Sequence, residues 1–257
     1  MPRHCYVLRV FTRGEEGGNP LGVVTDRSGL SPHVMQEIAT ELGFSETIYL
    51  DWREQDIPSV RIFTPTIELP FAGHPLVGIT WVLHRLGPGG PSQIECGIGP
   101  VRIGMDGDVA WVDAPLNQRV SQSAGLDGYL PGSVPVSVTT VEMPAAYHVI
   151  ELAEVAYVGA APAAESGMVF VFCRTGPDTV HARFFAPDAG VAEDPATGSA
   201  AVALAASMRS RGEMEGSLII SQGEEMGAPS TVQLTWDASG ARIGGTVVRD
   251  EVRWLER

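Results

Sequence analysis

The sequence contains no lysine, because all 17 of its basic residues are arginines. A pyridoxal-phosphate enzyme needs a lysine for its Schiff base, and a phosphate-binding P-loop also uses one. The absence therefore excludes both classes. The net charge of −14 argues further against nucleic acid and membrane surfaces as partners, since both attract clustered positive charge.

Long apolar runs and metal-ligand spacings are also missing. No stretch of eighteen apolar residues is present, so we expect no membrane span. The first twenty residues lack a signal-peptide core and read as a first strand, and we expect a cytoplasmic protein. The 3 cysteines form no CxxC pair and the 6 histidines no HExxH motif. We therefore expect no metal and no cofactor.

The residues that are present predict an α+β protein with a substantial core. The hydrophobic fraction is 44% and the charged fraction 19%. The segment 31–42 predicts an amphipathic helix that starts at Ser-Pro. Residues 14–22 are rich in glycine without GxGxxG spacing and predict a turn. Short alternating or β-branched segments predict strands at 5–12, 60–64, 100–105, 109–114, 146–152, 168–174, 181–187, 216–223, 230–236 and 241–248.

One segment of the chain is repeated. Residues 61–78 read RIFTPTIELPFAGHPLVG, and residues 183–201 read RFFAPDAGVAEDPATGSAA. The matched features are an initial Arg, a Phe-x-Pro, and a Gly at the start of a helix, with three extra residues in the second copy. The alternative is two unrelated strand-loop-helix units. The repeat predicts two similar domains, 1–118 and 119–257, joined near 122–138, with a last strand able to return to the first domain.

The helix that follows each copy has no polar face. HPLVGITWVLHRLG carries Pro75 in its first turn, and SAAVALAASMRSRG places Ser199 at the expected N-cap. A helix that is apolar all round must be buried on every side. We therefore expect each domain to wrap its strands around a central helix. The two helix N-termini would form an anion site, so a small carboxylate is the expected ligand.

Three side chains with acid–base potential belong to this arrangement: Glu46, His74 and Asp194. Each also has a plain structural interpretation. Asp194 precedes Pro195 as turn residues do, His74 could be a neutral packed imidazole, and Glu46 could cap a helix or end a strand. Their association with the repeat favours function. We expect Asp194 to face the site, and Glu193 to point away or pair with an arginine.

Five motifs resemble the PhzF-like phenazine-biosynthesis family. They are GNPLGVV (18–24), SET (45–47), FTPTIELPFAGHPLVG (63–78), EDPATGSAAVAL (193–204) and GGTVV (244–248). The resemblance implies the diaminopimelate-epimerase-like fold, in which each of two domains is a β-barrel-like sheet around a central apolar helix and the active site lies between them. It also implies a homodimer and a cofactor-independent isomerase, whose type enzyme shifts a proton and a double bond in 2,3-dihydro-3-hydroxyanthranilate.

The same resemblance implies roles for individual residues. Glu46, His74 and Asp194 match the catalytic positions, and Ser199 matches a substrate-contacting serine, with Gly73 and Gly198 as backbone donors. We include Asn19, in the first motif, among the substrate-binding candidates. In epimerases of this fold a Cys precedes each of these glycines, but here those positions are Ala72 and Thr197. Ala228 stands where many family members have Arg.

These observations predict a general acid–base isomerase of a small cyclic or unsaturated carboxylate. Glu46 would move the proton, while His74 and Asp194 would hold polar groups of the substrate. Two alternatives remain: an epimerase or racemase that uses Glu46 and Asp194 as its two bases, and a non-catalytic binder of small carboxylates. A binder gains nothing from burying two further negative charges, which argues against the last alternative.

Overall fold

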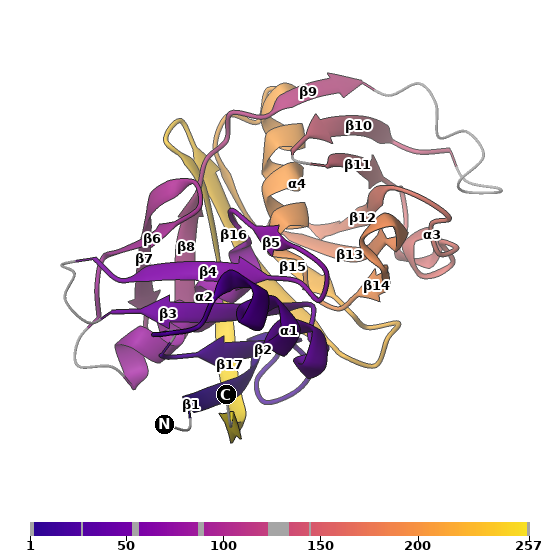
Figure 1. Ribbon diagram of the computed structural model, residues 1–257. Helices are drawn as coiled ribbons and strands as arrows, with labels where there is room; N and C mark the ends of the chain where they lie inside the picture. Colours follow the sequence, from indigo (N-terminus) through magenta and orange to yellow (C-terminus); the bar gives the residue numbers. More distant parts are fainter. Residues whose placement is uncertain are drawn as a thin grey trace. The chain divides into compact units, whose positions relative to one another are not determined.

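The computed structural model describes residues 3–26, 28–52, 57–86, 90–122, 134–143 and 145–255. The chain forms two compact units (Figure 1). Unit 1 comprises Met1–Asp113 with Gly244–Arg257, and unit 2 comprises Ala114–Ile243. Each unit is described by itself below. The predicted domain limit at 118/119 stays a prediction, because compactness alone does not define an independently folding domain.

Unit 1 is built from strands around one central helix. Its elements are β1 (Arg3–Thr12), β2 (Asn19–Val24), α1 (Pro32–Leu42), β3 (Glu46–Asp51), β4 (Ser59–Phe63), β5 (Glu68–Leu69), α2 (Gly73–Arg85), β6 (Gln93–Cys96), β7 (Gly99–Asp106), β8 (Val109–Ala114) and the larger part of β17 (Gly240–Leu255). Strand β1 lies between β2 and β17, antiparallel to both. Strand β2 is parallel to β3, and β3 is antiparallel to β4.

Unit 2 has the same construction. Its elements are β9 (Arg119–Gln122), β10 (Ser137–Glu142), β11 (Ala146–Glu151), α3 (Val155–Gly159), β12 (Met168–Gly176), β13 (Thr179–Ala186), η1 (Pro187–Ala189), β14 (Val191–Asp194), α4 (Gly198–Ser210), β15 (Gly216–Gln222) and β16 (Ser230–Asp237). The strand order is β9-β10-β11-β12-β13-β15-β16, with parallel pairs at β11–β12 and β13–β15. Strand β14 is antiparallel to β13.

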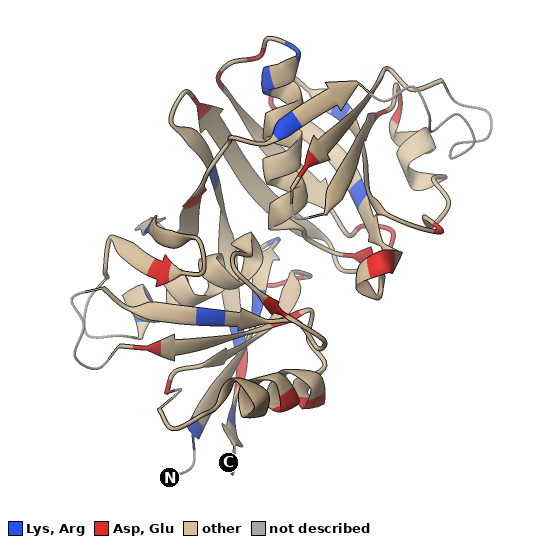
Figure 2. Ribbon diagram, turned by 45° about the horizontal axis from the view of Figure 1, so that its top comes forward, with Lys and Arg blue, Asp and Glu red and all other residues tan. Residues whose placement is uncertain are grey.

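The two central helices are buried on all sides, as the sequence predicted. Helix α2 contacts β1, β2, β3 and β7, and α4 contacts β9, β10, β11 and β16. Every residue of α4 from Ala200 to Met208 is buried, and its charge is confined to the last turn (Figure 2). In α2, a Cβ added at Gly78 would lie 2.2 Å from Leu21, so this glycine permits the close approach of β2.

The internal repeat is confirmed by strand register. In unit 1 Ile62 of β4 pairs with Leu69 of β5, and in unit 2 Phe184 of β13 pairs with Asp194 of β14. Both central helices then begin at the repeated glycine and run for 13 residues. The repeat extends further than the sequence motif indicated. A Cβ added at Gly97 or at Gly223 would lie 2.8 Å from the carbonyl oxygen of Pro70 or Pro195, respectively.

All ten predicted strand segments and the helix at 31–42 are found in the structure, the latter with Ser31 as its N-cap. Six strands and one short helix escaped sequence analysis: β2, β5, β6, β9, β10, β14 and α3. Each has at most 6 residues, so its sequence pattern is brief. Most of the predicted linker 122–138 lies outside the described residues.

Two local predictions were wrong. The turn expected at 14–22 ends at Gly18, and Asn19 already begins β2, because the backbone of residues 19–24 pairs with β1 and β3. Ser199 is not the N-cap of α4; the helix begins at Gly198 with Thr197 as its cap residue. The Thr197 hydroxyl does not cap the helix and bonds to Asp194 instead.

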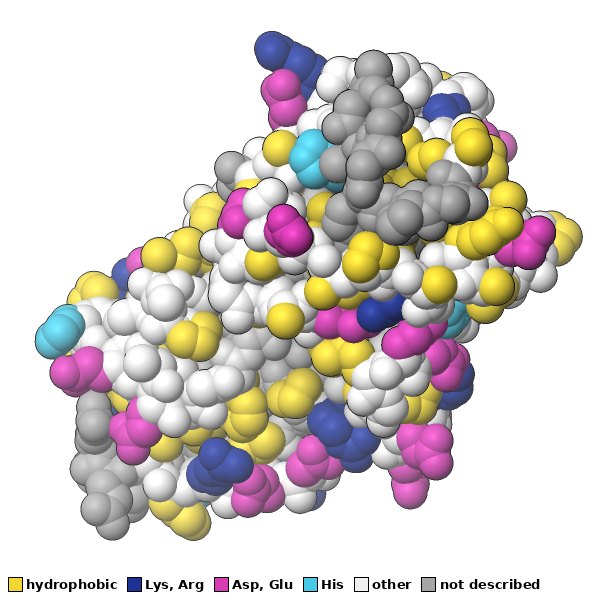
Figure 3. Space-filling model, turned by 90° about the vertical axis from the view of Figure 1, so that its right-hand side faces the viewer, with side chains coloured by type: hydrophobic (Ala, Val, Ile, Leu, Met, Phe, Trp, Pro, Cys, Tyr) yellow, Lys and Arg dark blue, Asp and Glu magenta, His cyan; other side chains and the backbone are white. Residues whose placement is uncertain are grey.

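Several arginines form ion pairs with carboxylates of the same unit. On the face shown in Figure 3, arginine side chains lie among acidic ones and, over the described residues, do not gather into one large basic area. Bidentate pairs join Arg61 to Glu68 and Arg183 to Glu193. Among the described residues, no helix is both long and apolar enough to cross a bilayer.

Candidate functional site

Unit 1 brings Glu46, His74 and Asn19 together. Nδ1 of His74 lies 2.9 Å from Oε2 of Glu46, and Nε2 of His74 lies 3.2 Å from the carbonyl oxygen of Asn19. His74 and Asn19 are buried, whereas the Glu46 side chain retains 18% of its exposure. The two elements that carry the acid and the imidazole both begin at this point, β3 at Glu46 and α2 at Gly73.

The partners of His74 restrict where its proton can be. A carbonyl oxygen only accepts hydrogen bonds, so Nε2 of His74 carries a hydrogen and donates it to Asn19. Nδ1 then faces Glu46 in one of two states. Either a neutral imidazole accepts a hydrogen bond from a protonated Glu46, or an imidazolium donates one to the carboxylate. In either state one hydrogen lies between Nδ1 of His74 and Oε2 of Glu46, so the acid and the imidazole are directly linked.

Two neighbours hold this pair in place. Ser45 donates to Oδ1 of Asn19 over 2.8 Å, which ties the start of β3 to the start of β2. Phe11 has a left-handed backbone with φ 66° and is fully buried, and its ring centroid lies 6.4 Å from that of His74. A bulky residue adopts this backbone only where the surrounding structure compensates its cost. The bulge in β1 at Phe11 therefore helps to hold the imidazole in position.

Unit 2 places Asp194 in a buried hydrogen-bonded group. Asp194 retains 8% of its exposure, and the hydroxyl of Thr197 donates to its Oδ2. Nε2 of Gln222 donates to the carbonyl oxygen of Asp194 over 2.7 Å and to Oγ1 of Thr197 over 3.1 Å. We call Asp194, Thr197 and Gln222 the polar triad of unit 2. A buried carboxylate held this way is positioned for chemistry or recognition rather than for solvation.

Ser199 lies in the first turn of α4 and is contacted by an aromatic side chain. The hydroxyl of Tyr147, on β11, donates to Oγ of Ser199 over 3.0 Å. The Tyr147 ring stacks on Phe184, the residue that pairs with Asp194, with ring centroids 5.7 Å apart. Gly198, Ser199 and Asp194 are therefore neighbours within unit 2. Gly73 and Gly198 each open a helix N-terminus, where free backbone N–H groups favour an anion.

Glu193 forms an ion pair with an arginine, as predicted. Both of its carboxylate oxygens lie 2.8 Å from the guanidinium of Arg183, which also donates to the carbonyl oxygens of Gly159 and Ala161. The same arginine lies over the ring of Phe185, just as Arg61 lies over Phe63 in unit 1. Glu193 therefore has a structural partner, whereas its neighbour Asp194 belongs to the polar triad.

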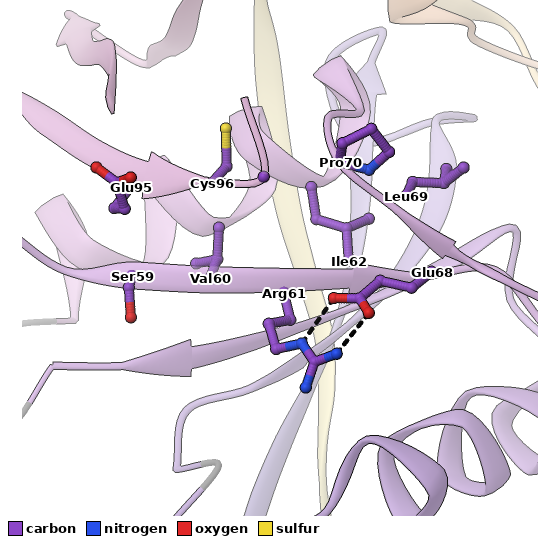
Figure 4. Close-up of a pocket in the computed structure, with 10 residues that line it drawn as sticks. Ser59, Val60, Arg61, Ile62, Glu68, Leu69, Pro70, Glu95 and Cys96 are labelled. Atoms are coloured by element: carbon purple, nitrogen blue, oxygen red, sulfur yellow. Dashed lines mark hydrogen bonds and ion pairs between the residues drawn. The ribbon is translucent and has the colours of Figure 1, made fainter. Parts of the chain in front are cut away.

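A cavity of about 450 Å³ opens in unit 1 between β4, β5 and β6 (Figure 4). It is lined by Ser59, Val60, Arg61, Ile62, Glu68, Leu69, Pro70, Glu95, Cys96 and Gly97. None of the predicted site residues lines it. Arg61 and Glu68 bind one another beside it, so the pair leaves little unneutralised charge for a ligand.

No thiol stands at either helix entrance. Cys5, Cys96 and Cys173 are buried and free, and Ala72 and Thr197 precede the two entrance glycines. Burial raises the pKa of Cys5 to about 11 and also raises the pKa of Cys96 and of Cys173. A protonated buried thiol is a poor base. Among the described residues, no three His, Cys, Asp or Glu side chains are grouped as a metal site requires.

Sequence reasoning named most of these residues but missed several neighbours. Glu46, His74 and Asn19 are joined in unit 1, and Asp194, Gly198 and Ser199 lie together in unit 2. Tyr147, Thr197 as a donor, and Gln222 were missed. The only available signal was the Gln-Gly step at 222–223, at the end of a predicted strand. The backbone of Ala228 accepts from Ser230, and its side chain is half-buried.

Comparison with known proteins identifies the family. The model of the family described as phenazine biosynthesis-like protein matches residues 8–123 and 159–249. The chain belongs to this family. It is 35% identical to an uncharacterized isomerase of Mesorhizobium japonicum, with 96% of each chain covered. It is 33% identical to the trans-2,3-dihydro-3-hydroxyanthranilate isomerase of Pseudomonas chlororaphis, with 88% of each chain covered. The chain is thus an isomerase of the phenazine biosynthesis-like family.

Solved structures confirm the fold. A PhzF-family phenazine biosynthesis protein of Bacillus anthracis superposes with a TM-score of 0.82 at 22% identity over 100% of both chains. A predicted epimerase of Pseudomonas aeruginosa superposes with a TM-score of 0.77 at 26% identity, again over 100% of both chains. The predicted α+β, diaminopimelate-epimerase-like fold is therefore correct.

Proposed function

We propose that this isomerase moves a proton and a double bond within a small cyclic or unsaturated carboxylate by general acid–base catalysis, without a cofactor. The observation that supports it best is the 2.9 Å contact between Nδ1 of His74 and Oε2 of Glu46. Because Nε2 of His74 is engaged by Asn19, the imidazole can exchange a proton only with Glu46. His74 therefore acts through Glu46, and the acid itself contacts the substrate.

In the proposed reaction the Glu46 carboxylate removes a proton from a substrate carbon beside the double bond. The C–H bonding electrons form a new double bond, and the original double bond opens toward its far carbon. Glu46 delivers a proton to that carbon, which restores the carboxylate. A positioned group of this kind contributes about 10²–10⁴-fold to the rate. In this step Nδ1 of His74 keeps its hydrogen and donates it to one oxygen of Glu46, and the other oxygen of Glu46 carries the substrate's proton between the two transfers.

Unit 2 supplies recognition in this proposal. Asp194 binds and orients a polar group of the substrate and supports the proton transfer. Ser199 and the backbone N–H groups at Gly198 bind the substrate carboxylate, because helix N-termini favour anions. The backbone N–H groups at Gly73 are the corresponding donors of unit 1. Asn19, a candidate contact, also holds His74 in place. We further propose that the protein is a homodimer. A molar mass from light scattering of twice the 27.3 kDa of one chain would support this proposal.

The test uses trans-2,3-dihydro-3-hydroxyanthranilate, the compound named for several relatives. We expect its absorbance to change as the double bond moves, and deuterium from D₂O to enter the product at one carbon. Glu46→Gln should abolish both signals. Metal analysis of the purified protein and activity after chelation complete the experiment. Stoichiometric zinc whose removal ends activity would contradict cofactor independence.

An epimerase is the second candidate, favoured by the 26% identity to a predicted epimerase of Pseudomonas aeruginosa. Glu46 and Asp194 would then act as two bases on one carbon. Loss of optical activity with hydrogen exchange at that carbon, and no change in absorbance, would support this candidate over the isomerisation.

A further inference from the structure

The polar triad of unit 2 has an apolar counterpart in unit 1. Strand register matches Asp194 with Leu69, because Phe184–Asp194 and Ile62–Leu69 are the equivalent pairs. Gly223 lies close to Pro195 as Gly97 lies close to Pro70, so the residues before these glycines, Gln222 and Cys96, are equivalent. Thr197 and Ala72 are equivalent because each precedes the first residue of a central helix. Unit 1 folds the same backbone with Leu69, Ala72 and Cys96. The fold therefore does not require the polar triad.

The hydrogen bonds of Gln222 have a defined direction. The atom 2.7 Å from the carbonyl oxygen of Asp194 must be the amide nitrogen, because two carbonyl oxygens would repel. The same nitrogen donates to Oγ1 of Thr197, so the hydroxyl hydrogen of Thr197 is directed to the Asp194 carboxylate. Thr197 is consequently a donor and not a base.

The burial of Gln222 lowers the stability of the fold, because one of its polar atoms has no hydrogen-bond partner among the described residues. It retains 1% of its exposure, and its Oε1 has no hydrogen-bond partner among the described residues. A buried polar atom without a partner destabilises the folded state, and an apolar side chain at this position would avoid that cost. Cys96 takes this position in unit 1 and finds a partner in the carbonyl oxygen of Gly99.

From these contacts we infer that Gln222 is a positioning residue, which directs the Thr197 hydroxyl onto Asp194 and fixes the Asp194 main chain at the entrance of α4. This inference rests on the proposed role of Asp194. It assigns to Thr197 the task of stabilising the ionised form of that carboxylate. Removing the donor should therefore raise the pH at which Asp194 takes up a proton.

The first experiment needs no substrate. Carbon-13 NMR of aspartate-labelled protein follows the carboxyl titration of Asp194, assigned by its loss in Asp194→Asn. We expect a higher titration midpoint in Thr197→Val, a smaller rise in Gln222→Met, and recovery of the wild-type midpoint in Thr197→Ser. The double variant of Gln222 and Thr197 should titrate like Thr197→Val alone, because the effect of Gln222 on the Asp194 titration passes through the Thr197 hydroxyl.

The neighbouring charges are the same in all these variants. On β13, β14 and the turn after β15, Arg183 pairs with Glu193, and His181 pairs with Glu225 over 2.8 Å. Cys96→Ala is the matched control in unit 1. It removes a buried side chain at the equivalent position and should lower stability without moving the Asp194 midpoint.

The second experiment measures kcat/KM against pH with trans-2,3-dihydro-3-hydroxyanthranilate. Gln222→Met should lower kcat/KM on the order of 10- to 100-fold through misplacement of Asp194, and should move the acidic limb to higher pH. If this compound is not turned over while the NMR midpoints shift as expected, the proposed function fails and the positioning role stands. An Asp194 midpoint in Gln222→Met equal to that of the wild type overturns the inference.

Discussion

The two segments that lead into the central helices, residues 68–74 and 193–199, share a backbone and differ in chemistry. Each segment has a glutamate that forms an ion pair with an arginine, and a proline whose carbonyl oxygen lies close to a glycine of another strand end. Each also has a glycine as the first residue of the central helix. The first segment continues with Leu69 and Ala72, and the second with Asp194 and Thr197. The shared residues build the fold, and the residues that differ are the candidates for function.

The first segment obtains its acid from elsewhere in the chain. Its His74 reaches Glu46 on β3, whereas the second segment carries Asp194 itself and has Ser199 in place of the histidine. Duplicated units thus present one acid each, at positions that are not equivalent. This asymmetry suits a reaction in which one acid moves the proton and the other orients the substrate.

The largest effect is expected for Glu46→Gln, which removes the proposed base and preserves shape. Turnover of trans-2,3-dihydro-3-hydroxyanthranilate should fall about 10²–10⁴-fold or more, with binding by calorimetry within a few-fold of wild type. Glu68→Gln, in the same unit, is the control and should turn over normally. Near wild-type turnover in Glu46→Gln would show that another group is the base.

Asp194→Asn should come next, because it changes recognition and chemistry together. We expect both kcat and substrate affinity to fall, on the order of 10- to 100-fold in kcat/KM. Leu69→Asn at the equivalent position of unit 1 is the matched control and should leave kcat/KM unchanged. A fall of kcat in Asp194→Asn with unaltered affinity would assign this residue to proton transfer alone.

The two arginine–glutamate pairs should differ in stability and not in chemistry. The side chains of Arg183 and Glu193 are 11% and 17% exposed, against 27% and 41% for Arg61 and Glu68. Glu193→Gln should therefore lower the unfolding free energy by about 2–3 kcal/mol, and Glu68→Gln by about 1 kcal/mol or less. Denaturant unfolding measures both. Equal losses would show that burial does not distinguish the pairs.

The smallest effect is expected for thiol modification, because neither segment carries a cysteine. Burial raises the pKa of Cys5 to about 11, so at pH 8 almost all of its thiol is protonated. Iodoacetamide should then label the folded protein slowly and leave activity unchanged, with faster labelling of Cys5 only as the pH approaches 11. Mass spectrometry in denaturant gives the fully labelled reference. Rapid inactivation at pH 8 would indicate a reactive thiol.

The sequence alone determined the features that depend on local pattern. The apolar helices 73–85 and 198–210 could be recognised as buried, because no face of either is polar. The repeat and the motifs around Glu46, His74 and Asp194 indicated the fold class and the family. The expectation that Glu193 points away or pairs with an arginine followed from placing two adjacent acids at a buried helix entrance.

Tertiary structure decided the contacts between residues far apart in sequence. Gln222, Thr197 and Asp194 meet because β15 ends beside the entrance of α4, and no local period encodes that meeting. The same holds for the hydrogen bond from Tyr147 to Ser199 and for the contact of the Asn19 carbonyl oxygen with His74. Ser199 was predicted to be the N-cap of α4 because hydroxyl residues favour that position. The helix in fact begins at Gly198, and Thr197 is its cap residue. Side-chain type restricts the possible chemistry, but strand pairing and packing choose which partners share a proton.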